Sequence, residues 1–550
     1  MCTSKQKRSG FAMRFFMVLF AFILAQTIFA QSLLATEQEE SYATYGHEYL
    51  LQEQPEEWLV SEEPSYNLDE IPHYTTDEIM AMMSTSIQPL NSQIIITEFG
   101  RTFLVLWQSD WYGAIDNLPW IDAILFMDIG FLPVPNLTLH DGITIPSGHH
   151  ITIVGNGGSI TLPQQLPSEA LFTLEHYASL TITDLTIIGP SFWNANTAFY
   201  LQDGSMAEIS NVRVDGVETG VVLGSQWSWG HPQAEFVMTN NSLISNVSNV
   251  VRNNGVFVMY DSRLIGNHWV DLGGHHSLFF LNHGSIIDGH VVVNQGPSGV
   301  FFNGGELTHR TLHINAHDQI SINNPWIVQR QHPRLQDFMN FPQHFIDVDF
   351  VIEGWGTVYI QGYINGHVDV HGGNVIFEGN HLLGASVHHV SIFYNHGNVS
   401  MANIYGGIFH NYGSTINAFL NGGFFRNQGF VGHMVNIHDG VFYNYGHIAG
   451  PIEIWHGSLY HNGGEINNWS WWSGQPASIT IHHGGEAFIS APINYNHSGQ
   501  PVVLINGGRL HLLDGGSINA WDGTAIAMST SMLGELIMQG GTFFGRLIFV

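Results

Sequence analysis

Histidine is the residue type with the most obvious capacity for chemistry in this sequence. The chain has 33 His but only 14 Lys and Arg together. Adjacent pairs occur at His149-His150, His275-His276, His388-His389 and His482-His483. Imidazole is a common ligand of transition metals, so one hypothesis is that rings stacked on successive turns of a repeating fold bind a transition metal. The hypothesis that we prefer is that these histidines are polar surface or turn residues. The sequence therefore assigns no metal ligand and no cofactor.

Tryptophan suggests a second kind of chemistry. Two groups of tryptophans lie where the repeats described below are interrupted. The first comprises Trp227 and Trp229, and the second Trp469, Trp471 and Trp472. Flat indole rings combine an apolar face with a polar N–H, and aromatic side chains favour interfaces. These residues are our candidates for stacking on the sugar rings of a polysaccharide or surface glycan. Packing within the core or a loop is the alternative.

Charge and the first residues indicate export. The net charge of -31 argues against nucleic acid, because phosphate neutralisation needs Lys and Arg. Lys5, Lys7, Arg8 and Arg14 precede or enter the apolar run 15–30. This pattern predicts a secretory signal peptide at residues 1–30, since the run is short for a membrane span. An uncleaved anchor is the alternative. After cleavage we expect no membrane span in the mature chain.

Beyond the signal segment the chain has no cysteine, because Cys2 is the single one. The mature protein therefore has no disulfide and no zinc-thiolate site, and repetitive packing must stabilise it. Residues 31–92 are acidic without a consistent period, which predicts a disordered linker.

From residue 94 the sequence pattern changes to short runs in which apolar residues alternate with Thr, and each run ends in Gly, Asn or Asp. Such runs are typical of strands with one buried face, closed by turns. Ile94–Thr97 begins them, and an amphipathic helix is expected over Thr102–Ala114, with Phe103 on its apolar face.

Two ladders of turn residues define the repeats. The first comprises Asn240, Asp261, Asn282 and Asn303, spaced by 21 residues, and the second Asn395, Asn411, Asn427 and Asn444, spaced by 16, 16 and 17. These periods predict a β-solenoid in which one coil is one repeat and equivalent side chains stack. Asn residues at the corners are expected to hydrogen-bond to one another as stacked amides, a structural role. Residues 93–310 would hold coils of about 21 residues, 311–350 an irregular insertion or seam, and 351–550 coils of about 16–17 residues.

The stretch from Ile94 to Pro190 resembles the start of pectate-lyase-like right-handed parallel β-helix proteins on bacterial surfaces. The resemblance is carried by Asp141–Gly148, Ile151–Gly157, Leu171–Leu174 and Leu180–Ile187. It implies an all-β, single-stranded, right-handed parallel β-helix (β-solenoid) with an N-terminal strand-helix-strand cap. Later Gly-Gly-Xaa-Phe units, such as Gly540–Phe543, resemble repeats of large secreted proteins of Gram-positive bacteria. The group includes adhesins, polysaccharide lyases and glycoside hydrolases, so the resemblance bears on fold more than on activity.

Catalysis is the alternative function. A lyase of this fold needs a basic residue and often calcium, and the candidate bases are Arg213, Arg252, Arg263, Arg310, Arg330 and Arg334. Asp184, Glu208, Asp215 and Asp261 are the candidate carboxylates, and glycoside hydrolysis would need two of them about 5–10 Å apart. The pectate-lyase and polygalacturonase signatures are missing, and no acidic cluster has calcium spacing. We therefore assign no catalytic residue. We expect a monomeric, non-enzymatic surface or adhesive protein, secreted or on the surface of a Gram-positive bacterium.

Overall fold

The computed structural model describes residues 94–97, 100–105, 108–126, 135–168, 170–190, 196–224, 233–247, 249–272, 277–294, 298–323, 345–467, 477–495 and 500–550. All of them belong to one compact unit, Ile71–Val550. The predicted signal peptide at 1–30 and linker at 31–92 lie outside these ranges. So do Trp227, Trp229, Trp469, Trp471 and Trp472.

The described chain is a parallel β-helix, as the sequence periods predicted. Strands of one coil pair in parallel with the equivalent strands of the next, and these pairings join all the named strands into one sheet. Strand β6 (His150–Val154) shows why the sequence folds this way. Its Ile151 and Ile153 are buried and pair with Leu180 and Ile182 of β9 (Ser179–Thr183), while the intervening Thr residues are only partly buried. Alternation of period two therefore builds one apolar interior along the coil axis.

The N-terminal cap contains two strands, a helix and a third strand. Strand β1 (Ile94–Thr97) pairs antiparallel with β2 (Gly100–Val105), and β2 pairs in parallel with β3 (Ala123–Phe126). Helix α3 covers only Gln108–Asp116. The predicted helix over Thr102–Ala114 is therefore wrong in its first part. Residues Thr102–Val105 are buried on both faces between two neighbouring strands, and a short apolar run of that kind has no period that separates strand from helix.

Coil length varies more than the sequence periods indicated. In the early coils His150 pairs with Ser179 and Ser179 with Met206, which are steps of 29 and 27 residues. The step falls to 21 between β15 (Glu235–Thr239) and β18 (Val256–Met259). Only part of residues 93–310 therefore has coils of about 21 residues. The early coils are longer because their connections are longer: eight residues separate β7 (Ser159–Thr161) from β8 (Ala170–Leu174), whereas three separate β15 from β16 (Leu243–Val247) and one separates β16 from β17 (Asn249–Asn253).

The segment predicted as irregular, 311–350, also contains regular coil. Strand β24 (Thr311–Ala316) pairs with β21 (Ile286–Asn294) on one side and with β27 (Asp349–Gly354) on the other. Strand β25 (Gln319–Ile322) likewise pairs with both neighbouring coils. Residues 324–344 lie outside the described ranges. Residues 311–323 therefore belong to the regular coil, contrary to the prediction, because Leu312 and Ile314 continue the buried column.

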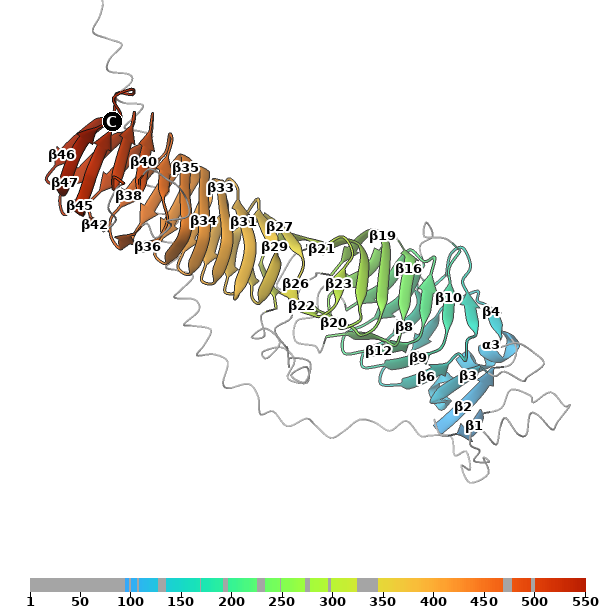
Figure 1. Cartoon of the computed structure of the whole chain (residues 1–550). Helices are drawn as coiled ribbons and strands as arrows, with labels where there is room; N and C mark the ends of the chain where they lie inside the picture. The colour runs from blue at the N-terminus through green and yellow to red at the C-terminus, as the bar shows by residue number, and fades with distance from the viewer. Residues whose placement is uncertain are drawn as a thin grey trace, which may run out of the picture. The chain divides into compact units, whose positions relative to one another are not determined.

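The coils that carry the candidate site are the most regular. They are built by β29 (Tyr363–Val370), β31 (His381–Val387), β33 (Asn398–Asn411), β34 (Ser414–Asn427), β35 (Phe430–Asn444) and β38 (Ser458–His461). Figure 1 shows β33, β34 and β35 side by side as successive rungs of the coil. Inside them Phe393, Phe409, Phe425 and Phe442 form a stack with ring centroids 4.7–5.0 Å apart. This spacing equals the distance of about 4.8 Å between paired strands, so each ring contacts its equivalent.

Candidate functional site

A column of buried amides holds one corner of these coils. Asn395, Asn411, Asn427 and Asn444 are fully buried and occupy equivalent positions in successive coils. The Nδ2 group of each donates to Oδ1 of the next, at 2.8 Å in every step. The same Nδ2 groups of Asn395 and Asn411 also donate to the backbone carbonyls of Ser414 and Phe430, at 3.0 Å. Buried amides are tolerated here because each has partners, and the column stabilises the corner.

His461 extends this column by one coil, which the sequence interpretation missed. It pairs with Asn444, whose Nδ2 donates to His461 Nδ1 at 3.1 Å, and its Nε2 lies 3.4 Å from the Pro492 carbonyl. The signal was present in the sequence, because Leu459-Tyr-His461 aligns with Phe442-Tyr-Asn444. Burial lowers the pKa of His461 to about 4, an effect that outweighs the opposing hydrogen bond to Pro492. A neutral ring can replace an amide here since it too has one donor and one acceptor.

The first ladder is divided between two columns. Asn240 and Asp261 are turn residues with positive φ, and the backbone N–H of Asn241 donates to the Asp261 carbonyl at 2.7 Å. Met259 pairs with Leu281, so Asn282 lies opposite Tyr260, one position before Asp261. Asn282 instead accepts a hydrogen bond at Oδ1 from Nδ2 of Asn303, at 2.8 Å, and these two residues are paired in register. The coil between Met259 and Leu281 is one residue longer, and this shift separates the two pairs.

A shallow groove of about 500 Å³ lies beside the amide column. Glycines line its centre, and Gly397, Gly413 and Gly429 follow Asn395, Asn411 and Asn427 at a distance of two residues. A Cβ on Gly413 would lie 2.1 Å from the Gly397 carbonyl oxygen, which no side chain can tolerate. The corner therefore demands glycine for close backbone approach, and the absence of side chains there leaves the groove open.

Aromatic and polar side chains line this groove. His396 and Tyr412 stack with ring centroids 4.9 Å apart and an interplanar angle of 5°. Tyr412 is 42% exposed and Phe430 40% exposed. The polar lining residues are Glu378, Asn380, Asn398 and Ser414. The site therefore presents aromatic rings beside amide, hydroxyl and carboxylate groups, and its lining contains neither Arg nor Lys.

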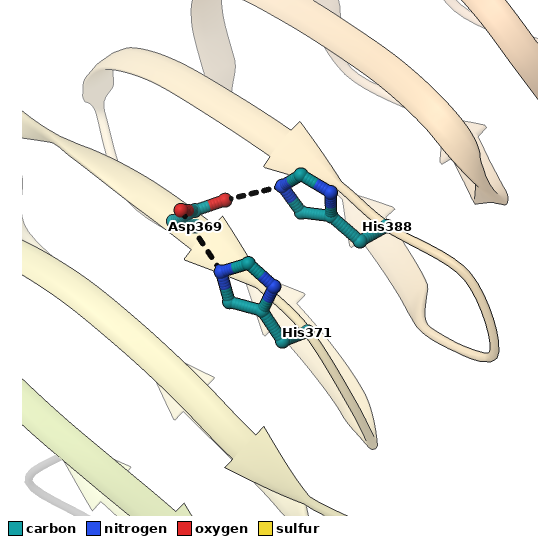
Figure 2. Close-up of side chains that lie close together, drawn as sticks. All are labelled: Asp369, His371 and His388. Carbon is teal, nitrogen blue, oxygen red and sulfur yellow. Dashed lines mark hydrogen bonds and ion pairs between the residues drawn. The ribbon is translucent and has the colours of Figure 1, made fainter.

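Three ionisable side chains converge on another face of neighbouring coils (Figure 2). Asp369 lies near the end of β29, His371 directly follows β29, and His388 directly follows β31. Asp369 Oδ2 is 3.0 Å from His371 Nε2, and Asp369 Oδ1 is 2.7 Å from His388 Nε2. The two imidazole rings stack at 4.3 Å between centroids and 13° between planes.

Nearby groups complete this environment. The ring of Tyr405 stacks on His388 with a centroid distance of 5.1 Å. His367 Nε2 lies 2.7 Å from the Ser386 hydroxyl, and burial lowers the pKa of His367 although Asp369 and Asp349 act to raise it. The sequence had singled out His388 as one member of a pair. Asp369 and His371 went unnoticed although they are two residues apart in the sequence, and only the coil step brings His388 to them.

The residues considered for catalysis are distributed differently. Arg213 pairs with Asp215 at 3.2 Å, Arg263 with Asp288 at 2.9 Å and Arg310 with Asp347 at 2.9 Å. Arg252 lies in β17 (Asn249–Asn253), whereas Arg330 and Arg334 lie outside the described residues.

The carboxylates considered with them are also placed apart. Glu208 pairs with Thr181, three positions before Asp184, and Asp184 accepts a hydrogen bond from Asn211 Nδ2. Asp215 binds Ser245 and Asn246 as well as Arg213. The side chains of Arg213, Arg263, Arg310, Asp184 and Asp215 are thus engaged with local partners.

No family model matches the chain, and neither a curated protein nor a solved structure matches it. The fold and the side-chain geometry therefore carry the functional argument. None of the helices in the described part of the chain has the length and apolar character that a bilayer span requires.

Proposed function

We propose that this protein is an exported, non-enzymatic β-helix of a bacterial surface that binds polysaccharide through the groove beside the amide column. The observation that carries the proposal is the presence of two partly exposed aromatic rings, Tyr412 and Phe430, beside the polar side chains of Asn380, Asn398 and Ser414 in one groove. One face of each ring packs on a neighbouring imidazole, and the remaining surface is open to a ligand. Aromatic rings at that exposure offer flat apolar surface to a ligand, while amides and hydroxyls offer hydrogen bonds of both polarities.

The charge of the groove defines the class of polysaccharide. Glu378 is its only carboxylate, and the lining has no Arg or Lys to pair with an acidic sugar. Fixed negative charge disfavours anionic ligands, and the net charge of -31 reinforces this at long range. The ligand we propose is a neutral glycan chain that lies across successive coils.

The site of action follows from the sequence features of export. The basic and apolar start of the chain favours secretion. The absence of cysteine after Cys2 means that folding outside the cell needs no disulfide, and the stacked coils supply the stability. The resemblance of Ile94–Pro190 to pectate-lyase-like surface proteins supports the same placement, as do the Gly-Gly-Xaa-Phe units for a Gram-positive origin.

The test is binding of the full mature chain to a glycan array, followed by titration with the best neutral polysaccharide. Replacing Tyr412 and Phe430 together with Ala should weaken binding by at least about tenfold, since two ring contacts are lost. Trp355→Ala is the matched control, because that ring is 80% exposed but lies outside the groove lining. Equal loss of binding in the control and the double variant would contradict the proposal.

An enzyme assay addresses the alternative function. The mature chain is incubated with neutral and acidic polysaccharides, with and without calcium, and released unsaturated uronides are read by ultraviolet absorbance. We expect no release. Release that disappears on replacing one arginine, such as Arg252, would overturn the non-enzymatic assignment in favour of a lyase.

A further inference from the structure

We propose that Asp369, His371 and His388 form a binding site for a divalent transition-metal ion of the zinc class. One ligand atom from each, the two Nε2 atoms and a carboxylate oxygen, lies within 4.8 Å of the others. Metal–ligand bonds of about 2.0–2.2 Å to imidazole nitrogen and carboxylate oxygen require ligand atoms at such separations around one ion. Two imidazoles and one carboxylate are a donor set that zinc accepts with a further position open.

The orientation of the rings supports this assignment. Both histidines direct the same atom, Nε2, toward a single carboxylate, as Figure 2 shows. Without metal, each Nε2–H donates to Asp369. When an ion binds, each neutral ring carries its proton on Nδ1, and the Nε2 lone pair is free for coordination. Tetrahedral ligand atoms with bonds of about 2.0–2.2 Å lie roughly 3.4 Å apart, so the carboxylate of Asp369 must rotate slightly away from the two Nε2 atoms to admit the ion.

The surroundings leave room for the ion and for a ligand on it. The side chains of His371, Asp369 and His388 are 42%, 35% and 30% exposed, so water reaches the cluster. The neighbouring coils place Val351 and Ser386 opposite Asp369, and Ile352 opposite Val370. None of these three neighbours is basic. Tyr405 covers the outer face of the His388 ring and holds its orientation.

A second imidazole stack in the same protein shows what distinguishes this cluster. His290 and His309 stack with centroids 5.1 Å apart, and His309 Nε2 lies 3.9 Å from Asp288. There, however, Arg263 pairs with Asp288 at 2.9 Å, and its positive charge opposes a cation. Of the two aspartates, Asp288 forms an ion pair with an arginine, whereas Asp369 hydrogen-bonds to His371 and His388.

The experiment titrates the metal-free full chain with ZnCl2 and, separately, with Co²⁺, whose visible absorption reports tetrahedral coordination by nitrogen and oxygen. The test variant is His371→Gln combined with His388→Gln, and the matched control is His290→Gln combined with His309→Gln. We expect the wild-type chain and the control to bind zinc equally, and the test variant to bind it at least about tenfold more weakly and to lose the Co²⁺ absorption.

The outcomes are distinct. Equal zinc affinity of the wild type and the test variant would overturn the proposal. An equal loss of zinc affinity in the control and the test variant would also overturn it, because zinc would then bind to scattered surface histidines. Asp369→Asn provides a second variant, since it retains shape but removes the charge. Circular dichroism checks that each variant is folded, which the exposure of these side chains leads us to expect. Glycan binding is measured in parallel, and its loss or retention does not bear on the metal site.

Discussion

Acid should destabilise the coils around β38 through one buried imidazole, His461. This ring is fully buried, accepts a hydrogen bond from Asn444 at Nδ1, and has a pKa of about 4 in the folded chain. In the unfolded chain its pKa is the ordinary 6.5. Between these values the unfolded state binds more protons, so the free energy of unfolding falls as the pH is lowered from about 6.5 toward about 4. The stability contribution is complete above pH 6.5.

The magnitude follows from the two pKa values. At about pH 5 the proton linkage removes about 2 kcal/mol relative to neutral pH, and the full loss below the folded pKa is about 3 kcal/mol. Replacing His461 with Asn removes the titrating group and places an amide where the preceding coils have one. The variant should therefore be protected against acid by about 2 kcal/mol, an approximately 30-fold difference in local opening.

The assay is hydrogen exchange of peptides covering β38, compared between wild type and His461→Asn at about pH 8 and about pH 5. Local opening is the appropriate measure because coils of a solenoid open in part, without global two-state unfolding. The other histidines with a lowered pKa, His367, His410 and His482, are the same in both chains and cancel in the comparison. His447→Asn, a half-buried site one coil away, is the control. A ratio of protection between variant and wild type that does not change with pH would refute the reasoning.

Two further predictions concern the corner. Asn411→Ala removes an amide that donates two hydrogen bonds and accepts two. It should lower the free energy of unfolding by at least about 3 kcal/mol, because buried partners are left unpaired. Asn398→Ala at the surface should change it by less than about 1 kcal/mol, and guanidinium denaturation measures both variants. Gly413→Ala should lower the midpoint of thermal unfolding strongly, because its Cβ would overlap a backbone carbonyl, whereas Gly463→Ala, with no atom closer than 3.9 Å, should leave it nearly unchanged.

The sequence determined the architecture wherever the coil length is constant. Asn395, Asn411, Asn427 and Asn444 are spaced by 16, 16 and 17 residues, and each coil of the structure advances by those numbers. When successive coils have equal length, distance along the chain becomes a position in space, so a repeated Asn predicts a stacked amide. Burial then follows from alternation, as in Ile151 and Ile153.

Tertiary structure decided what the period alone leaves open. One additional residue between Met259 and Leu281 moves Asn282 out of the column of Asp261, although the spacing of 21 is unbroken in the sequence. A shift of one position changes which side chains face one another, because side chains of a strand alternate. Strand β2 illustrates the same limit, since no local signal but its pairing with β3, joined at Thr102 and Phe103 by pairing with β1, makes Thr102–Val105 a strand.

The candidate sites belong to this second class. Asp369 and His388 are 19 residues apart, and they meet only because the coil between them has the length that brings Ser386 opposite Asp369. The groove likewise arises where Gly397, Gly413 and Gly429 approach one another across coils, a contact that no single repeat contains. The sequence shows that the chain is rich in histidine and aromatic residues, and the winding of the backbone determines which of these side chains lie close together.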